Sequence, residues 1–368
     1  MKIKIPGYNG NYRIMSLATD EKTKDDLNSE NVNMLYVTAD DIRVFPDDII
    51  LTKERDIVNR FRDCNNYDVF ELFEDGMAYR CYDDSSSENV FFITEKCNSN
   101  CTMCPMPDFT RKRGNTSNID NLIEIASHIP SDVPYMTITG GEPFMVGKEL
   151  FRLLKYCREK FEHTEFQLLT NGRIFAIEEY TKLIRETMPN HLVVGIPIHG
   201  SCAEVHDMIT RTPDSFNQTI KGLVMLQELC VPTEIRIVVC RDNASDLNNI
   251  AKLIAEKMGR SSFVSIMAME MTGNAHTNKN KVWISYRESF QYVRPAVETL
   301  IKAGIDVRLY NFPLCTVDRD MWLICFKSIS SWKVRYDEIC EECSVKKACG
   351  GVFAGTIQLE HEELEPVI

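Results

Sequence analysis

The sequence predicts an α/β protein built around a partial (β/α)6 barrel of the TIM type. From Val90 onward, short apolar runs typical of strands alternate with amphipathic stretches of helical period. Such alternation indicates parallel strands that are joined by right-handed helical crossovers. Clusters of cysteine, glycine and polar residues follow several of these runs, and parallel α/β folds place their active sites there. A partial barrel with its site at the carboxyl ends of the strands accounts for both observations.

Three parts are expected along the chain of 368 residues. Residues 1–88 carry short apolar runs between polar clusters, and we interpret them as a small β-rich or mixed segment that either docks a peptide or caps one end of the barrel. Residues 89–310 form the barrel, with strands at 90–94, 135–139, 166–170, 192–198, 234–240 and 263–269. Helices between them are expected at 119–129, 148–161, 177–188, 215–229 and 245–258. Residues 311–368 form a cysteine-rich extension and tail.

The composition restricts the class of protein. The 44% hydrophobic content is ordinary for a soluble globular chain, no apolar run of about 18 residues occurs, and the amino terminus lacks the apolar core of a signal peptide. Many of the 14 cysteines fall into two groups with metal-like spacing, which favours a reducing compartment over a disulfide framework. We therefore expect a cytoplasmic protein without a membrane partner. The net charge of -12 argues against a nucleic-acid partner.

The first cysteine group is Cys97, Cys101 and Cys104, spaced C-x3-C-x2-C directly after the strand at 90–94. Three thiolates on one short loop can bind three irons of a cubane cluster and leave the fourth iron open, as a catalytic site requires. The alternatives are a zinc site or three unrelated buried cysteines. A zinc ion would need a fourth ligand, and no histidine or cysteine occurs in the twenty residues after Cys104.

This loop, with Met103 before its last cysteine, resembles the signature of the radical S-adenosylmethionine (SAM) superfamily. The resemblance implies that Cys97, Cys101 and Cys104 bind a [4Fe-4S] cluster whose open iron takes the amino and carboxylate groups of SAM. It also implies an electron donor such as flavodoxin or ferredoxin. One electron then splits SAM into methionine and a 5′-deoxyadenosyl radical, which abstracts hydrogen from the substrate. Hydrogen abstraction needs no acid-base pair, and no catalytic side chain is predicted.

Further motifs at strand ends carry the resemblance along the chain. After the second strand, Gly140, Gly141 and Glu142 precede a proline and match the family motif that holds the SAM amino group, although such a sequence also makes an ordinary turn. Asn171 after the third strand occupies a position where the family contacts SAM, or simply forms an Asn-Gly turn. Arg211 after the fourth strand is expected to pair with the SAM carboxylate, or else to form a surface ion pair.

Two other groups near these motifs are expected to be structural. His199 and His206 fit satisfied core histidines better than ligands. The basic run at 111–113 is typical of a solvated face, with substrate contact as the alternative, because the run borders the cysteine loop.

The second cysteine group is Cys340, Cys343 and Cys349, spaced C-x2-C-x5-C, with Cys315 or Cys325 available as a fourth ligand. Four thiolates make a closed site, which a structural zinc ion would also satisfy. The pattern after a radical SAM barrel resembles the auxiliary-cluster extension called SPASM or, in its shortened form, twitch. The resemblance implies a second [4Fe-4S] cluster with Cys315 as the preferred fourth ligand. No cysteine follows Cys349, so one auxiliary cluster is expected instead of two.

Shorter motifs at 311–315, 328–333 and 349–353 resemble maturases of the His-Xaa-Ser peptide system, in which paired radical SAM proteins accompany a small precursor peptide. The expected function is therefore modification of a ribosomally synthesised precursor peptide by hydrogen abstraction, which gives a crosslink, an oxidation or an epimerisation. A second radical SAM maturase is an expected partner. The alternatives are a radical SAM cyclase or dehydrogenase that acts on a small molecule or nucleotide, and a non-catalytic partner of a second maturase.

Overall fold

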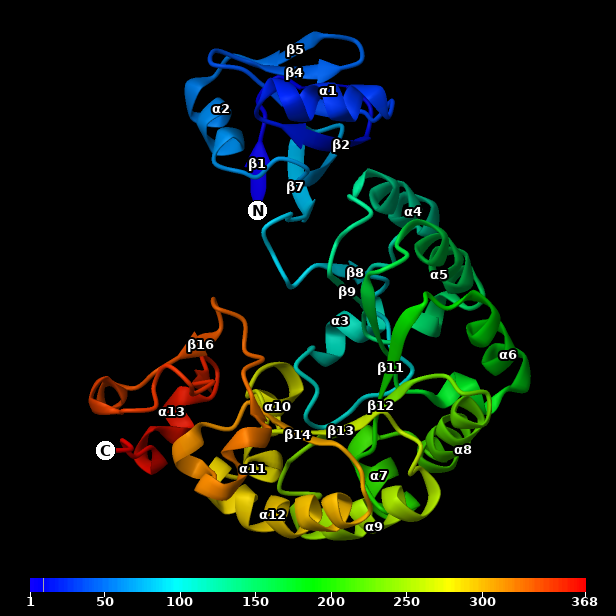
Figure 1. Ribbon diagram of the computed structural model, residues 1–368, viewed down its shortest axis with the longest axis vertical. Helices are drawn as coiled ribbons and strands as arrows, with labels where there is room; N and C mark the ends of the chain where they lie inside the picture. The colour runs from blue at the N-terminus through cyan, green and yellow to red at the C-terminus, as the bar shows by residue number, and fades with distance from the viewer. Residues whose placement is uncertain (9) are drawn as a thin grey trace.

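The computed structural model describes residues 1–8 and 10–368, and the first part of the chain folds into a seven-stranded mixed sheet (Figure 1). In sheet order its strands are β1 (Lys2–Lys4), β7 (Met77–Tyr82), β6 (Val69–Leu72), β2 (Arg13–Ala18), β3 (Met34–Val37), β4 (Ile42–Phe45) and β5 (Ile49–Thr52). Helix α1 (Glu21–Ser29) joins the parallel strands β2 and β3, and α2 (Arg55–Arg62) leads into β6. Helix α1 was not predicted, because only Thr23 and Leu27 of this helix are buried and its amphipathic pattern is weak.

The amino-terminal sheet packs against the barrel through helix α4 (Ile119–His128), as Figure 1 shows. Ile14 of β2 belongs to the same buried apolar cluster as Ile125 of α4. Beside them the Ser16 hydroxyl lies 2.9 Å from Nδ1 of His128. Burial lowers the pKa of His128 to about 4, so this contact joins two neutral side chains at physiological pH.

The barrel wall consists of parallel strands in chain order. They are β8 (Val90–Phe92), β9 (Tyr135–Thr139), β10 (Glu165–Leu169), β11 (His191–Pro197), β12 (Thr233–Val238), β13 (Phe263–Met267), β14 (Val307–Tyr310) and β15 (Cys325–Phe326). All six predicted strands are present, and the predicted partial barrel is confirmed. The four-residue β14 and the two-residue β15 extend it beyond the prediction, because runs this short carry little periodic signal.

Long helices cover the outside of the curved sheet, and short ones occupy the loops at its carboxyl end (Figure 1). The long helices are α4, α5 (Glu149–Lys160), α6 (Glu178–Thr187), α8 (Ser215–Glu228), α9 (Leu247–Lys257) and α12 (Tyr286–Lys302). The short ones are α3 (Asp108–Arg113), α7 (Ala203–Thr210), α10 (Gly273–Thr277) and α11 (Lys279–Val282). In the described part of the chain, none of the helices is both long and apolar enough to cross a membrane.

Side chains alternate across the wall of the barrel, and this alternation makes its interior polar. On β12, Ile235 and Ile237 are fully buried in the apolar cluster that the helices share, while Glu234 and Arg236 line a cavity inside the barrel. Gly195 on the neighbouring strand makes room for this pair, because a Cβ there would lie 3.1 Å from Arg236 Cδ and 2.8 Å from Leu169 Cδ2.

The chain ends in a small extension that contains β16 (Val334–Arg335), β17 (Val352–Phe353) and α13 (Ile357–Glu360). Glu360 fastens this extension to the barrel, because its buried carboxylate accepts the Tyr286 N–H at the start of α12 at 3.0 Å. Burial raises the pKa of Glu360 to about 8. The extension therefore returns to the barrel beside the strands that close it.

Candidate functional site

The loop of Cys97, Cys101 and Cys104 leaves β8 at the carboxyl end of the barrel. Backbone amides already point at two of its sulfurs: Ser99 N–H donates to Cys97 Sγ and Met106 N–H to Cys104 Sγ, both at 3.4 Å. Such amides stabilise a metal-bound thiolate. Burial raises the pKa of Cys97 to about 11 and of Cys101 to about 12, so these thiols keep their protons until a metal displaces them.

The glycine turn after β9 lies against the backbone that leads into the cysteine loop. Gly141 N–H donates to Thr94 O at 2.7 Å, and Glu142 N–H donates to Lys96 O at 2.8 Å. A Cβ on Gly140 would lie 2.5 Å from Thr94 O, and one on Gly141 would lie 2.6 Å from Glu95 O. Both glycines are therefore required for this backbone contact, and their predicted part in binding SAM stays a prediction.

Glu142 is 2% exposed, and its carboxylate joins the turn after β9 to the end of β10. It accepts the Phe144 N–H at 3.0 Å, the Asn171 N–H at 2.7 Å and the Thr170 hydroxyl at 2.8 Å. Burial raises the pKa of Glu142, and these three donors oppose that rise. The predicted contact between this carboxylate and the SAM amino group stays a prediction.

Asn171 extends the same network to the cysteine loop. Its side-chain amide donates to Asn98 Oδ1 at 2.7 Å. Arg173, which the sequence analysis did not single out, donates to Asn98 O at 3.1 Å and to the Ser99 hydroxyl at 3.3 Å. The end of β10 therefore fixes the cysteine loop at Asn98 and Ser99.

Two asparagines beyond the sixth strand also support the loop and were missed by the sequence analysis. Asn274 N–H donates to Cys104 O at 2.9 Å and its side chain donates to Cys101 O at 3.1 Å. The Asn278 side chain donates to Thr102 O at 2.8 Å. Gly273 permits this approach, since its φ is +55° and a Cβ would collide with Pro105 O. Their position in the loop after a parallel strand, where such folds place their sites, was the sequence signal that could have identified them.

Arg211 lies at the mouth of a cavity of about 200 Å³ that it lines together with Cys97. Its guanidinium donates to Asn278 Oδ1 at 3.2 Å. Across residues 1–8 and 10–368, Arg211 forms no ion pair with a carboxylate. The cation therefore faces the first cysteine group without a fixed anionic partner, as its predicted contact with the SAM carboxylate requires.

The two histidines are buried as predicted, but Nδ1 of His199 has no hydrogen-bond partner in the described chain, so only His206 is seen to be satisfied. His199 and His206 are 5% and 2% exposed, and the His199 N–H donates to His206 Nδ1 at 3.2 Å. Burial lowers the pKa of His199 to about 3 and that of His206 to about 4, so both rings are neutral.

The basic run at 111–113 is a solvated face only in part. Lys112 and Arg113 are exposed, whereas Arg111 is 4% exposed. The sequence could not distinguish them, because a six-residue helix of charged side chains shows no apolar stripe.

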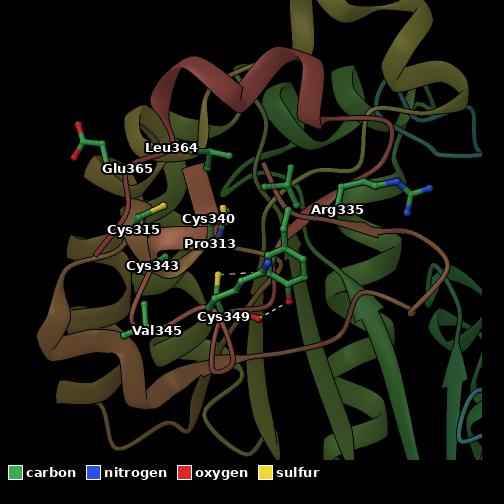
Figure 2. Close-up of a pocket in the computed structure, with 13 residues that line it drawn as sticks. Pro313, Cys315, Arg335, Cys340, Cys343, Val345, Cys349, Leu364 and Glu365 are labelled. Atoms are coloured by element: carbon green, nitrogen blue, oxygen red, sulfur yellow. Dashed lines mark hydrogen bonds between the residues drawn. The ribbon is translucent and has the colours of Figure 1, made fainter. Parts of the chain in front are cut away.

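The second cysteine group surrounds a common cavity in the carboxyl-terminal extension (Figure 2). Cys315, Cys340, Cys343 and Cys349 line it. Leu314 N–H and Gly351 N–H both donate to Cys349 Sγ at 3.4 Å, and Val367 N–H donates to Cys343 Sγ at 3.4 Å. The Cys325 thiol lies outside this cavity and donates to Met321 O at 3.6 Å. This arrangement favours Cys315 over Cys325 as the fourth ligand.

Neither cysteine group is arranged around a single metal ion in the described chain. A tetrahedral zinc ion with Zn–S bonds of about 2.3 Å would bring its sulfurs to within ~3.8 Å of one another. In the described chain, no three His, Cys, Asp or Glu side chains are arranged to hold one ion. A cluster spreads its ligands, because each thiolate binds a different iron. The cavity between the four cysteines holds about 20 Å³, so the exposed loops around Cys340 and Cys343 would have to part around a cluster.

A third cavity, of about 350 Å³, lies inside the barrel beside this extension. Glu234 and Arg236 line it, and Phe353, which follows Val352 of the second cysteine site, closes one side. The Glu234 carboxylate accepts Arg236 Nη1 at 2.9 Å, Gln167 Nε2 at 2.5 Å and the Ser265 hydroxyl. Among residues 1–8 and 10–368, Arg236 Nη2 has only the Met267 sulfur, at 3.3 Å, as a partner. The cavity wall therefore offers spare hydrogen-bond donors to a ligand.

Comparison with known proteins identifies the central part of the chain. Residues 91–254 match the family model described as the radical SAM superfamily. The antilisterial bacteriocin subtilosin biosynthesis protein AlbA of Bacillus subtilis is 27% identical over 168 residues, which are 45% of this chain and 36% of AlbA. The AdoMet-dependent heme synthase of Oleidesulfovibrio alaskensis is 27% identical over 190 residues, which are 50% of this chain and 45% of the synthase. The chain thus spans less than half the length of these two relatives.

A solved structure shows the same fold. Streptococcus suis SuiB, in a crystal structure bound to its precursor peptide SuiA, superposes with a TM-score of 0.51 and 12% identity over 62% of this chain and 49% of SuiB. The resemblance to the radical SAM superfamily is confirmed, and a domain of this family implies a [4Fe-4S] cluster and SAM as its cofactors.

Replacing Gly141 by alanine tests the backbone contact at the first site. The added Cβ meets two carbonyl oxygens that no rotamer change can move, so we expect G141A to lose about 1–3 kcal/mol of stability and most of the iron at the first cysteine group. Urea unfolding and iron analysis measure both effects. G259A is the matched control, because a Cβ there meets Ala255 O at an ordinary 3.5 Å. Wild-type iron content and stability in G141A would contradict the requirement for a glycine at this backbone contact.

The fourth ligand of the second site is tested by two cysteine variants. C315A should lower the iron content of anaerobically reconstituted protein from about eight to about four atoms per chain, because Cys340 and Cys343 lie on exposed loops that neighbouring segments hold less firmly than they hold the first cysteine loop. C325A should retain about eight, since its thiol lies outside the cavity. The reverse pattern of iron contents would assign the fourth position to Cys325.

Proposed function

We propose that this protein, whose residues 91–254 form a radical SAM domain, cleaves SAM reductively and uses the radical to modify a ribosomally synthesised peptide. Cys97, Cys101 and Cys104 hold the catalytic cluster, and Cys315, Cys340, Cys343 and Cys349 hold an auxiliary one. SAM is positioned by Gly140, Gly141, Glu142, Asn171 and Arg211. When bound, the first cluster supplies the electron that splits SAM into methionine and a 5′-deoxyadenosyl radical, and the second supplies an electron acceptor.

The observation that carries this proposal is the way the cysteine loop is held. Four separate segments bind its backbone or side chains: the turn after β9, the end of β10, the end of α7 and the start of α10. The end of α7 contributes the Thr210 and Ile209 carbonyls, which accept the Asn100 and Thr102 N–H groups at 3.0 and 2.8 Å. A loop that is fixed from four sides presents its three thiols in one geometry, as a catalytic metal site requires.

The chain's own charges support SAM binding at the same place. Arg211 brings a guanidinium without a carboxylate partner to the cavity beside Cys97, and a guanidinium binds a carboxylate in bidentate fashion. The two glycines bring backbone to within hydrogen-bonding distance of the loop base. These groups orient the amino acid part of SAM, and its adenosine part then extends toward the barrel interior.

The cavity inside the barrel supports a peptide substrate. Its volume of about 350 Å³ lies at the small end of ligand sites, so it suits one side chain better than a tetrapyrrole. The spare donors of Arg236 favour a side chain or backbone group with acceptor oxygens. Asn311 and Phe353 line this cavity, whereas Pro313 and Val352 line the second cysteine site, so a side chain in the cavity would lie close to that site. A small molecule remains the second candidate, since one of the two relatives is named a heme synthase.

The partners follow from this chemistry. Reduction of the catalytic cluster requires a one-electron donor such as flavodoxin or ferredoxin, and the His-Xaa-Ser resemblance adds a second radical SAM maturase. We assign peptide docking or capping of the barrel to residues 1–88, radical chemistry to residues 89–310 and the auxiliary cluster to residues 311–368.

Activity is tested first with SAM and dithionite. Reconstituted wild-type protein should form 5′-deoxyadenosine, and C101A should form none while it keeps about four irons at the second site. C81A, which changes a cysteine of the amino-terminal sheet, serves as the control and should behave as wild type. Co-expression with each short peptide that is encoded beside the gene should then give a mass shift with wild type and none with C101A. 5′-Deoxyadenosine without any modified peptide would favour the small-molecule substrate.

The cavity is tested by neutralising its ion pair as a unit, so that no buried charge is left alone. In E234Q/R236Q, SAM cleavage without substrate should continue, while modification of the peptide falls about 10-fold to 100-fold because charged hydrogen bonds of about 1.5–3 kcal/mol are lost. R308Q on the next strand but one lies outside the cavity and is the control. Unchanged peptide modification in the double variant would exclude the cavity as the substrate site.

A further inference from the structure

Arg111 is a buried cation at the first cysteine site, and the function proposed above does not use it. It lies in the last turn of the short helix α3, which follows the cysteine loop. Its side chain is 3% exposed, whereas that of its neighbour Lys112 is 69% exposed. The chain therefore buries one of two adjacent basic residues and leaves the other in water.

The hydrogen bonds of Arg111 leave its charge only partly compensated. One amino group donates to Asn100 Oδ1, which is neutral and also accepts the Asn274 side chain at 3.1 Å. The same amino group is 3.4 Å from an oxygen of Asp108, whose side chain is 42% exposed and binds Lys112 at 2.8 Å. The Nε of Arg111 is buried and has no partner in the described chain.

A buried guanidinium with so weak a partner is unfavourable unless a further negative charge is present in the functional state. The place of that charge follows from the neighbours of Arg111. Asn100 lies between two of the cysteines, and Arg111 lines the same cavity of about 200 Å³ as Cys97. Asp108 is the only carboxylate among the described residues that line that cavity, and it is already shared with Lys112. The missing negative charge is therefore expected at the cysteines of the first group, on the side of the cavity that Cys97 lines.

We propose that the Arg111 guanidinium is the fixed counter-charge of the cluster held by Cys97, Cys101 and Cys104, and that it makes this cluster easier to reduce. Three thiolates around a doubly positive core leave one net negative charge, and the reducing electron makes it two. A fixed cation in a buried environment favours the more negative state, so it raises the midpoint potential. Arg111 is then a positioning residue, and the inference depends on the cluster in the proposed function.

The experiment compares midpoint potentials in titrations with dithionite, followed by EPR on the full chain without SAM. The signal of the first cluster is identified as the one that C101A lacks, and the second cluster serves as an internal reference. We expect R111Q to shift the first cluster to a more negative potential and R111K to keep it near the wild-type value. K112Q is the matched control: it removes an adjacent cation that shares Asp108 but is exposed, and it should cause no shift.

The outcomes separate the inference from the proposed function. An unchanged midpoint potential of the first cluster in iron-replete R111Q overturns the inference. If the affinity of R111Q for SAM falls while this potential is unchanged, the guanidinium binds the SAM carboxylate instead. If R111Q holds no iron at the first site, R111K decides the question. A cluster of wild-type potential in R111K would support a need for the positive charge, and loss of the cluster in R111K as well would overturn the inference. Wild-type protein without any reducible cluster overturns the proposed function together with the inference.

Discussion

The first cysteine site depends on a contact between two pieces of backbone that leave no room for a side chain. The turn at Gly140 and Gly141 meets the carbonyl groups of residues 94–96, directly before the first cysteine. Because β8 and β9 are parallel neighbours, their carboxyl ends emerge side by side, and this contact locks the two emerging loops together. The remaining supports of the cysteine loop all act on a segment whose base is already fixed.

The electrostatics of the site differ from those of the whole protein. The chain carries a net charge of -12, yet the described residues that line the cavity beside Cys97 include Arg111, Lys112 and Arg211 and a single carboxylate, Asp108. Glu142, the buried carboxylate nearby, has its negative charge held by backbone amides and a hydroxyl. A positively lined cavity in an acidic protein attracts a small anionic ligand and does not favour a polyanion.

The sequence was sufficient for features that rest on local pattern. Strand and helix periodicity predicted six strands and five helices of the barrel but not α12, and cysteine spacing singled out both cysteine groups. The sequence was insufficient where contacts between distant segments decide whether a side chain is buried or which site it joins. The burial of Arg111 beside an exposed Lys112, the roles of Asn274 and Asn278 and the exclusion of Cys325 from the second site all depend on which segments meet in space. Helix α1 was missed for a simpler reason, since a helix with two buried side chains shows almost no amphipathic signal.

The contact between Asn274 and Asn100 spans 174 residues, and this separation orders events during protein synthesis. At a translation rate of about 5–20 residues per second, the ribosome needs roughly 9 to 35 s after it has made Asn100 before it makes Asn274. Throughout that interval the nascent chain carries three thiols on a loop that lacks at least one of its four supports. Iron can therefore reach a complete loop only after residue 274 has been made, and the cell must keep those thiols reduced until then.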